Sequence, residues 1–203
     1  PKDIPESVAQ ASGAAAKAAS VIASERGKLI AMKELPPEKD VFKEEPRIGV
    51  FVCHCGINIG GYVHVPEVVE YAKRLPDVVY AEHNLYTCSQ DTQARIREKI
   101  KEFNLNRVIV ASCTPRTHEP LFRETVREAG LNPYLFEMTY IRDQCSWVHM
   151  HQPKEATEKA KDLVRSVVAK ARLLKPLKNP VVNVTPVGLV IGGGVSGMTA
   201  ALE

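Results

Sequence analysis

Four short apolar runs alternate with amphipathic stretches over residues 47–152, and this alternation constrains the fold more than any other feature. The runs are RIGVFV (47–52), DVVYAEHNLY (77–86), RVIVAS (107–112) and PYLFEM (133–138). They are short and rich in Val, Ile, Tyr and Phe, which is typical of strands. The stretches between them carry apolar residues at helical spacing. A strand followed by a helix, repeated, predicts an α/β fold: a small open parallel sheet with flanking helices, Rossmann-like in topology.

The residues before this region have a different composition. The first thirty predict one Ala-rich N-terminal helix, because Asp3 can cap it, Pro5 suits its first turn and Gly27 can end it. Residues 31–46 are polar, charged and rich in proline, which indicates a linker. The chain begins with Pro1 and not with Met, so we expect a segment of a longer polypeptide.

Composition and charge exclude several classes of protein. The 203 residues are 44% hydrophobic and carry a formal net charge of +3, with basic and acidic residues evenly mixed. This balance argues against binding of nucleic acid or of an anionic membrane surface. No apolar run reaches the ~20 residues of a membrane span. Five cysteines are an odd number, unlike a secreted disulfide framework, so we expect a globular protein of the reducing cytoplasm.

The five cysteines follow the predicted strands one by one. Cys53 and Cys55 come at the end of the first strand, Cys88 follows the second, Cys113 the third, and Cys145 lies in a short helical piece after the fourth. The carboxyl ends of parallel strands meet at one edge of the sheet, where ligands bind. Thiolates gathered there suit a [4Fe-4S] cluster or a structural zinc. A redox-active thiol pair and simple packing of buried cysteines are the alternatives.

A second motif lies near the carboxyl end of the sequence. Gly192, Gly194 and Gly197 form the pattern GxGxxG between a predicted strand and a predicted helix, the context of a dinucleotide-binding fingerprint. Such glycines allow a tight turn and a close approach of the backbone to a pyrophosphate. The acidic residue expected about 20 positions further on lies beyond Glu203.

Several of these stretches together resemble a known family. They are RIGVFVCHCGINIGG, LYTCSQDTQ, NRVIVASCTPRTHEPLFRETVREAGLNPYLFEMTYIRDQCSWVHMH and VGLVIGGGVSGMTAALE. They closely resemble the amino-terminal region of the flavin-containing A subunit of heterodisulfide reductase and its relatives, from about residue 47 to the end. The first segment, PKDIPESVAQASGAAAKAASVIA, looks like a late helix of the flavin domain in the same family. The resemblance thus implies a parent polypeptide with two such units in tandem.

The resemblance implies an electron-transfer module of a larger oxidoreductase complex. It implies one [4Fe-4S] cluster here, FAD in the full-length protein and, in some members, flavin-based electron bifurcation. Expected partners are the other subunits of such a complex, electron-donor subunits of the hydrogenase or formate dehydrogenase type, and a second copy of the chain. The implied thiolate ligands are Cys55, Cys88, Cys113 and Cys145, with Cys53 as the alternative. Backbone amides of the glycines after Cys55 are expected to donate hydrogen bonds to cluster sulfurs. The alternative function is a zinc-binding or metal-free docking domain of the same complex.

These interpretations divide the chain into five parts. They are a C-terminal helix of a preceding flavin domain (1–30), a linker (31–46), the cluster-binding domain (47–152), a helix and second linker (153–185), and the start of a FAD-binding Rossmann domain with its first strand and helix (186–203). Other residues are interpreted more plainly. We expect His54 to lie beside the ligands without ligating, Arg116 to form a structural ion pair, and Trp147 to be a core or docking aromatic.

Overall fold

The computed structural model describes residues 2–28, 30–31 and 33–202, and its centre is one four-stranded sheet. The strands are β1 (Ile48–Cys53), β2 (Val78–Asn84), β3 (Arg107–Ser112) and β4 (Phe136–Tyr140). All three neighbouring pairs are parallel and the strand order is β2-β1-β3-β4. The predicted α/β class, with an open parallel sheet, is therefore confirmed, and each predicted strand falls within a few residues of its observed position.

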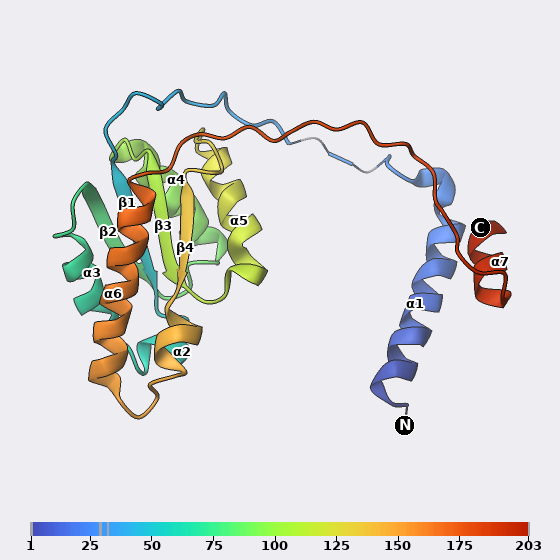
Figure 1. The fold of residues 1–203 in the computed structure, drawn as a ribbon, viewed down its shortest axis with the longest axis horizontal. Coiled ribbons are helices and arrows are strands. Elements are labelled where there is room, and N and C mark those ends of the chain that lie inside the picture. The colour runs from blue at the N-terminus through green and yellow to red at the C-terminus, as the bar shows by residue number, and fades with distance from the viewer. Residues whose placement is uncertain (1, 29, 32, 203) are drawn as a thin grey trace.

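Four helices cover the two faces of the sheet (Figure 1). They are α3 (Val65–Ala72) and α6 (Pro153–Ala171) on one face, and α4 (Gln90–Glu102) and α5 (Pro115–Glu128) on the other. Every residue of β1 and β3 is buried, as expected for central strands covered on both sides. Successive side chains of β1 point to opposite faces of the sheet. Val50 and Val52 therefore pack in the core under α3 and α6, whereas Phe51 packs in the core under α4 and α5.

Five shorter or peripheral elements complete the described chain. They are α1 (Ile4–Val21), the 3-10 turn η1 (Ala23–Glu25), α2 (Ile57–Gly60), the π-helix η2 (Arg142–Ser146) and α7 (Val195–Leu202). The predicted cap of α1 is confirmed, because Asp3 Oδ1 accepts a hydrogen bond from the amide of Glu6 at 2.8 Å. The helix ends at Val21, earlier than the predicted thirty residues. No residue of α1 or α7 is buried among those that the structure describes.

The strand expected before Gly192 is not formed. Helix α7 follows the glycines as predicted, but residues 187–191 have no strand pairing in the part of the chain that the structure describes. A strand requires a hydrogen-bonded neighbour, and this segment pairs with neither of the outer strands, β2 and β4. The strand–helix unit is therefore present only as its turn and helix.

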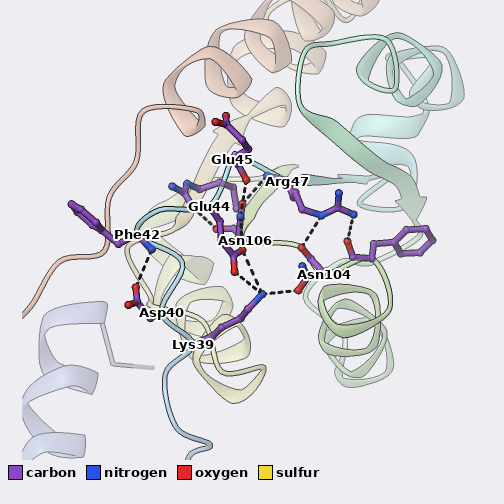
Figure 2. Close-up of polar contacts among 10 residues, drawn as sticks. Lys39, Asp40, Phe42, Glu44, Glu45, Arg47, Asn104 and Asn106 are labelled. Atoms are coloured by element: carbon purple, nitrogen blue, oxygen red, sulfur yellow. Dashed lines mark hydrogen bonds and ion pairs between the residues drawn. The ribbon is translucent and has the colours of Figure 1, made fainter.

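The polar segment before β1 is docked on the domain. Val41 is fully buried in the core under α4 and α5. The side chain of Asn106 is also fully buried. Its Nδ2 donates to Glu44 Oε2 at 3.1 Å and to the backbone carbonyl of Glu45 at 2.9 Å, and its Oδ1 accepts from the backbone amide of Arg47 at 2.7 Å. Figure 2 shows these contacts converging at the amino-terminal end of β1. The segment that the composition suggested as a linker thus contributes to the core.

The chain enters and leaves the domain at the same edge of the sheet. Asn132 Nδ2 donates to Glu38 Oε1 at 3.0 Å and to the carbonyl of Leu177 at 2.9 Å, which ties the incoming segment to the outgoing one. Arg107, the first residue of β3, also donates to the carbonyl of Leu174 at 2.8 Å. Both connections therefore lie at the amino-terminal ends of the strands (Figure 1). The cysteines follow the carboxyl ends of the strands, on the opposite side of the domain. Among the helices described, none is both long and apolar enough to cross a membrane.

Candidate metal centre at the carboxyl edge of the sheet

The two central strands deliver three of the cysteines. Cys53 is the last residue of β1 and Cys55 follows two positions later, while Cys113 comes directly after β3. Because β1 and β3 are neighbours and the chain continues from β1 toward β2 and from β3 toward β4, the space between them is the topological switch point of the sheet. Ligand sites of open α/β sheets form at this point.

The outer strands deliver the other two cysteines. Cys88 lies in the short turn between β2 and α4, just before the N-cap residue Ser89. Cys145 is part of η2, the π-helix that follows β4. All five cysteines are free thiols, and Cys53, Cys113 and Cys145 are buried.

Four of the thiols influence one another's pKa. Burial raises the pKa of Cys88, and negative charge on Cys53 and Cys55 raises it further. The pKa of Cys113 is likewise raised by burial, lowered in part by the guanidinium of Arg142, and raised by Cys55 and Cys53. Such coupling requires proximity of the charged groups. The structure therefore groups Cys53, Cys55, Cys88 and Cys113.

Cys145 is buried in the same core under α3 and α6 as Cys53. Its side chain is fully buried, and burial raises its pKa to about 11, an effect opposed only by Lys159. No other thiol contributes to this shift among the described residues. Cys55 packs against the same core, and the amides of Cys55 and Thr87 tie the sulfur of Cys53 to Cys55 and to the residue before Cys88.

The four thiols share a region without forming a finished cage. Within the described ranges, no set of three or more His, Cys, Asp or Glu side chains has the close arrangement of a metal site. A groove of ≈ 580 Å³ lies between the start of α3 and the start of α6, but cysteines do not line it.

The sulfur of Cys53 accepts two backbone hydrogen bonds. The amide of Cys55 donates to it at 3.2 Å and the amide of Thr87 at 3.3 Å. Amides aimed at a sulfur stabilise a thiolate and tune a metal bound to it. The Thr87 donor comes from the loop after β2, and nothing in the sequence marks it, because any residue other than proline supplies the same amide.

The glycines after Cys55 do not act as predicted. Gly56 donates its amide to the carbonyl of Leu85, Gly60 to that of His54, and Gly61 to that of Ile57. These amides serve the turn into α2 and are not free to reach a sulfur. Gly56 has a different role: its φ of 55° is one that L residues rarely adopt, and a Cβ there would lie 2.8 Å from the hydroxyl of Tyr86.

Unpartnered buried polar atoms are concentrated at this edge. Six buried side-chain atoms have no hydrogen-bond partner among the described residues, and five of them lie at or just after the strand ends: Asn84 Oδ1, Thr87 Oγ1, Ser112 Oγ, Arg142 Nε and Asp143 Oδ2. Ser112 lowers the pKa of the adjacent Cys113 but makes no hydrogen bond of standard geometry. Buried groups of this kind cost free energy unless another group satisfies them. Thiols and unsatisfied hydroxyls together fit a sulfur-rich group held between the loops.

Arg142 is a site residue that the sequence reasoning missed. Its guanidinium carbon lies 4.5 Å from the centre of the Trp147 ring, and Nη2 lies 3.7 Å from Asp143 Oδ1. Arg116, which was expected to form a structural ion pair, is exposed in the first turn of α5 and makes no ion pair within the described chain. Arg142 is placed at the site by the register of β4 on β3, and that register cannot be inferred from the sequence.

Two histidines lie beside the thiols. His54 Nε2 and His83 Nδ1 are 3.1 Å apart, and the two rings meet edge to face with centroids 4.9 Å apart. Burial, followed by the neighbouring His83, lowers the pKa of His54. His54 is therefore harder to protonate than an ordinary histidine.

Exposed apolar side chains form a rim around the same edge. They project from the loops after β1, after β2 and after η2: Ile57, Leu85, Tyr86, Trp147, Val148 and Met150. Trp147 is 47% exposed, which favours the docking interpretation over a place in the core.

The glycine motif is the second candidate site. Gly192 has a φ of 121°, and a Cβ on Gly197 would lie 2.0 Å from the carbonyl oxygen of Gly192, so the first turn of α7 packs against the loop as the fingerprint requires. Gly194 accepts, through its carbonyl, the amide of Met198 at 2.9 Å.

Comparison with known proteins gives one consistent family. No family model matches the chain. The second of the iron-sulfur A subunits of CoB–CoM heterodisulfide reductase in Methanopyrus kandleri is 62% identical over 161 residues, which are 79% of this chain and 24% of the relative. The A subunit of the H(2):CoB-CoM heterodisulfide,ferredoxin reductase of Methanothermobacter marburgensis is 58% identical over 82% of this chain and 25% of the relative. The A subunit of a ferredoxin/F(420)H(2)-dependent CoB-CoM heterodisulfide reductase from Methanosarcina acetivorans is 50% identical over 77% of this chain and 20% of the relative. The chain is therefore a homologue of heterodisulfide reductase A subunits and spans about a quarter of their length.

Proposed function

We propose that residues 47–152 bind one [4Fe-4S] cluster at the carboxyl edge of the sheet and pass electrons between it and a neighbouring flavin. The observation that carries this proposal is the convergence of two backbone amides, that of Cys55 and that of Thr87 next to Cys88, on the sulfur of Cys53. The relatives support it, since all three are named as parts of a heterodisulfide reductase and one of the names includes iron-sulfur. A [4Fe-4S] cluster takes four thiolates.

The ligands we propose are Cys53, Cys55, Cys88 and Cys113. This set replaces Cys145, implied by the family resemblance, with Cys53. The sulfur of Cys53 is tied by backbone amides to Cys55 and to the loop that carries Cys88, whereas the sulfur of Cys145 makes no hydrogen bond within the described chain. Cys53 is also the sulfur on which two amides converge.

Each part of the site has a role toward such a cluster. When bound, the cluster would accept and release single electrons. The four sulfurs would hold it as thiolates, and the amides of Cys55 and Thr87 would stabilise the negative charge on Cys53. The core under α3 and α6 closes the site from behind and keeps water from the buried sulfurs. The hydroxyls of Thr87 and Ser112 remain free to donate to sulfur.

The flavin belongs to the longer protein. Gly192, Gly194 and Gly197 would hold the pyrophosphate of FAD through the turn before α7. The adenine, ribose and flavin contacts would come from residues outside this sequence. Bifurcation of electrons at that flavin is part of the same proposal for the whole protein.

Partners follow from the names of the relatives and from the exposed rim. We place this module in a complex of the heterodisulfide reductase type, with hydrogenase or formate dehydrogenase subunits as electron donors. The exposed Leu85, Tyr86 and Trp147 offer an apolar surface at the edge where electrons would arrive. The same rim favours the second candidate function, a docking domain whose cysteines hold zinc.

Metal analysis separates the two candidates. The 203-residue chain, purified without oxygen and reconstituted with iron and sulfide, is expected to hold about four iron atoms per chain. It should show a broad visible absorption band that bleaches with dithionite. Colourless protein with one zinc per chain would contradict the proposal and support the docking domain. A chain with neither metal would contradict both metal sites.

A further inference from the structure

We infer that Arg142 is the electrostatic partner of the cluster and raises its reduction potential. This inference rests on the proposed function, because it assigns a role toward the group that the four thiolates would hold. It concerns a residue that neither the cysteine pattern nor the glycine motif singles out.

Strand register places Arg142 beside the thiols. In the parallel pairing of β3 with β4, Ser112 lies opposite Tyr140. Cys113 and Ile141 are the next residues, so Arg142 begins η2 at the same edge from which Cys113 projects. The guanidinium is close enough to lower the pKa of Cys113. Arg142 is therefore one residue past the level of Cys113 on the neighbouring strand, on the β4 side of the thiols.

The guanidinium is held in place but is not satisfied by the chain. It stacks on Trp147 at 4.5 Å, and its contact with Asp143 is long, at 3.7 Å. Only 21% of the side chain is exposed, and its buried Nε has no hydrogen-bond partner among the described residues. The carbonyl of Arg142 accepts from the amide of Trp147 at 3.0 Å and from the hydroxyl of Ser146 at 2.9 Å, which fixes the π-helix that carries it.

A buried N–H donor without an acceptor is expensive, and cluster sulfurs are acceptors. Segments of π-helix are also frequent at functional sites. Other charges on the packed elements are Asp143 on η2 and Lys159 on α6, and the second of these acts on Cys145. Arg142 is therefore the cation placed to act on the proposed ligand Cys113.

The electron balance defines the effect. Reduction of the cluster adds one electron, supplied by the flavin in the protein or by dithionite in the test, with no bond made and no proton moved. The added negative charge is stabilised by a fixed positive charge nearby, more strongly at a partly buried site than in water. Removing the charge should thus favour the oxidised form and lower the potential.

The test is a redox titration of the reconstituted 203-residue chain, followed by electron paramagnetic resonance. At a fixed potential, Arg142→Gln should lower the ratio of reduced to oxidised cluster about tenfold, a shift of about 59 mV for one electron. Arg142→Lys keeps the charge and should shift the potential less. Arg116→Gln, at an exposed arginine on α5, is the matched control and should leave the potential unchanged.

The outcomes separate this inference from the proposed function. Full iron content with an unchanged potential in Arg142→Gln would overturn the inference alone. A wild-type chain that binds no cluster would overturn both. Arg142→Met, which keeps the apolar stem against Trp147, replaces Arg142→Gln if the latter loses iron, and an unchanged potential there is equally decisive. Loss of the cluster in both neutral variants but not in Arg142→Lys would assign Arg142 to holding the site and overturn its role in the potential.

Discussion

The amide of Thr87 donates to the sulfur of Cys53 at 3.3 Å and so joins the loop after β2 to the end of β1. The amide of Cys55 donates to the same sulfur at 3.2 Å. Two donors from different segments fix the position of this sulfur more firmly than packing alone. Cys53 is thereby better prepared to ligate than a thiol buried only among apolar side chains.

The first prediction compares Cys53 with Cys145. Cys53→Ala should lose the cluster or reduce its iron content, because it removes the thiolate that the two amides support. Cys145→Ala should keep about four iron atoms per chain, since the sulfur of Cys145, unlike that of Cys53, accepts no amide within the described chain. Iron and sulfide assays with absorption spectra check both variants. The reverse result would restore the ligand set implied by the family resemblance, with one thiolate after each strand.

The second prediction concerns thiol reactivity before reconstitution. Alkylation requires the thiolate, and the pKa of about 11 leaves little of it on Cys145 at neutral pH. Cys55 and Cys88 are partly exposed, so iodoacetamide should label them well before Cys145 in the folded protein. Mass spectrometry of peptides over time measures the order, and labelling in urea gives the control. Early labelling of Cys145 would contradict its burial.

Much of this architecture is visible in the sequence, for physical reasons. Central strands of a parallel sheet are buried on both faces, so RVIVAS and GVFV are recognisable as strands without further information. The rule that parallel strands end at one edge then places the cysteines together. The same rule does not tell which thiols are close: that depends on loop conformation, such as the φ of 47° at Cys55 and the π-helix that carries Cys145.

Contacts made by ordinary residues are harder to predict. Asn106 and Asn132 hold both chain connections, yet an isolated asparagine carries no periodic signal. The buried Val41 lies in a stretch whose composition is otherwise that of a linker. The apolar residues before Gly192 predict a strand, but a strand depends on a neighbour that the local sequence does not encode.

The third prediction tests the turn after Cys55. Gly56→Ala places a Cβ at a φ of 55° and 2.8 Å from the hydroxyl of Tyr86, which should destabilise the fold by about 1–3 kcal/mol. Thermal or urea unfolding measures the loss. Gly188→Ala is the matched control, because nothing in the described chain lies within 4 Å of its added Cβ, and its stability should be unchanged. Equal stability of the two variants would show that the turn relaxes without strain.

The fourth prediction concerns the docked segment before β1. Asn106→Ala removes three hydrogen bonds and leaves the amide of Arg47 without its partner, so we expect a loss of about 1–3 kcal/mol. Limited proteolysis should then cut residues 33–46 faster. Glu45→Ala is the control, since Glu45 contributes its backbone carbonyl, which the substitution keeps. Similar proteolysis of both variants would show that the other contacts of the segment, such as the buried Val41 and the bond from Asn132 to Glu38, hold it without Asn106.

The last prediction uses the pH dependence of the same contact. The hydrogen bond from Asn106 lowers the pKa of Glu44 from its ordinary value of 4.5, despite the opposing effect of burial and with further help from Lys39. A carboxyl whose pKa is lowered by folding stabilises the protein above its ordinary pKa, and this contribution disappears as the pH falls through the lowered value. At neutral pH, wild-type protein should therefore be more stable than Glu44→Gln. Below the pKa of Glu44 both side chains are neutral, so the two stabilities should converge.

Urea unfolding from pH 7 into the acid range measures the difference, with Glu45→Gln as a control that shows no such convergence. A difference that stays constant with pH would mean that the charge of Glu44 does not contribute and that the contact acts through its shape alone.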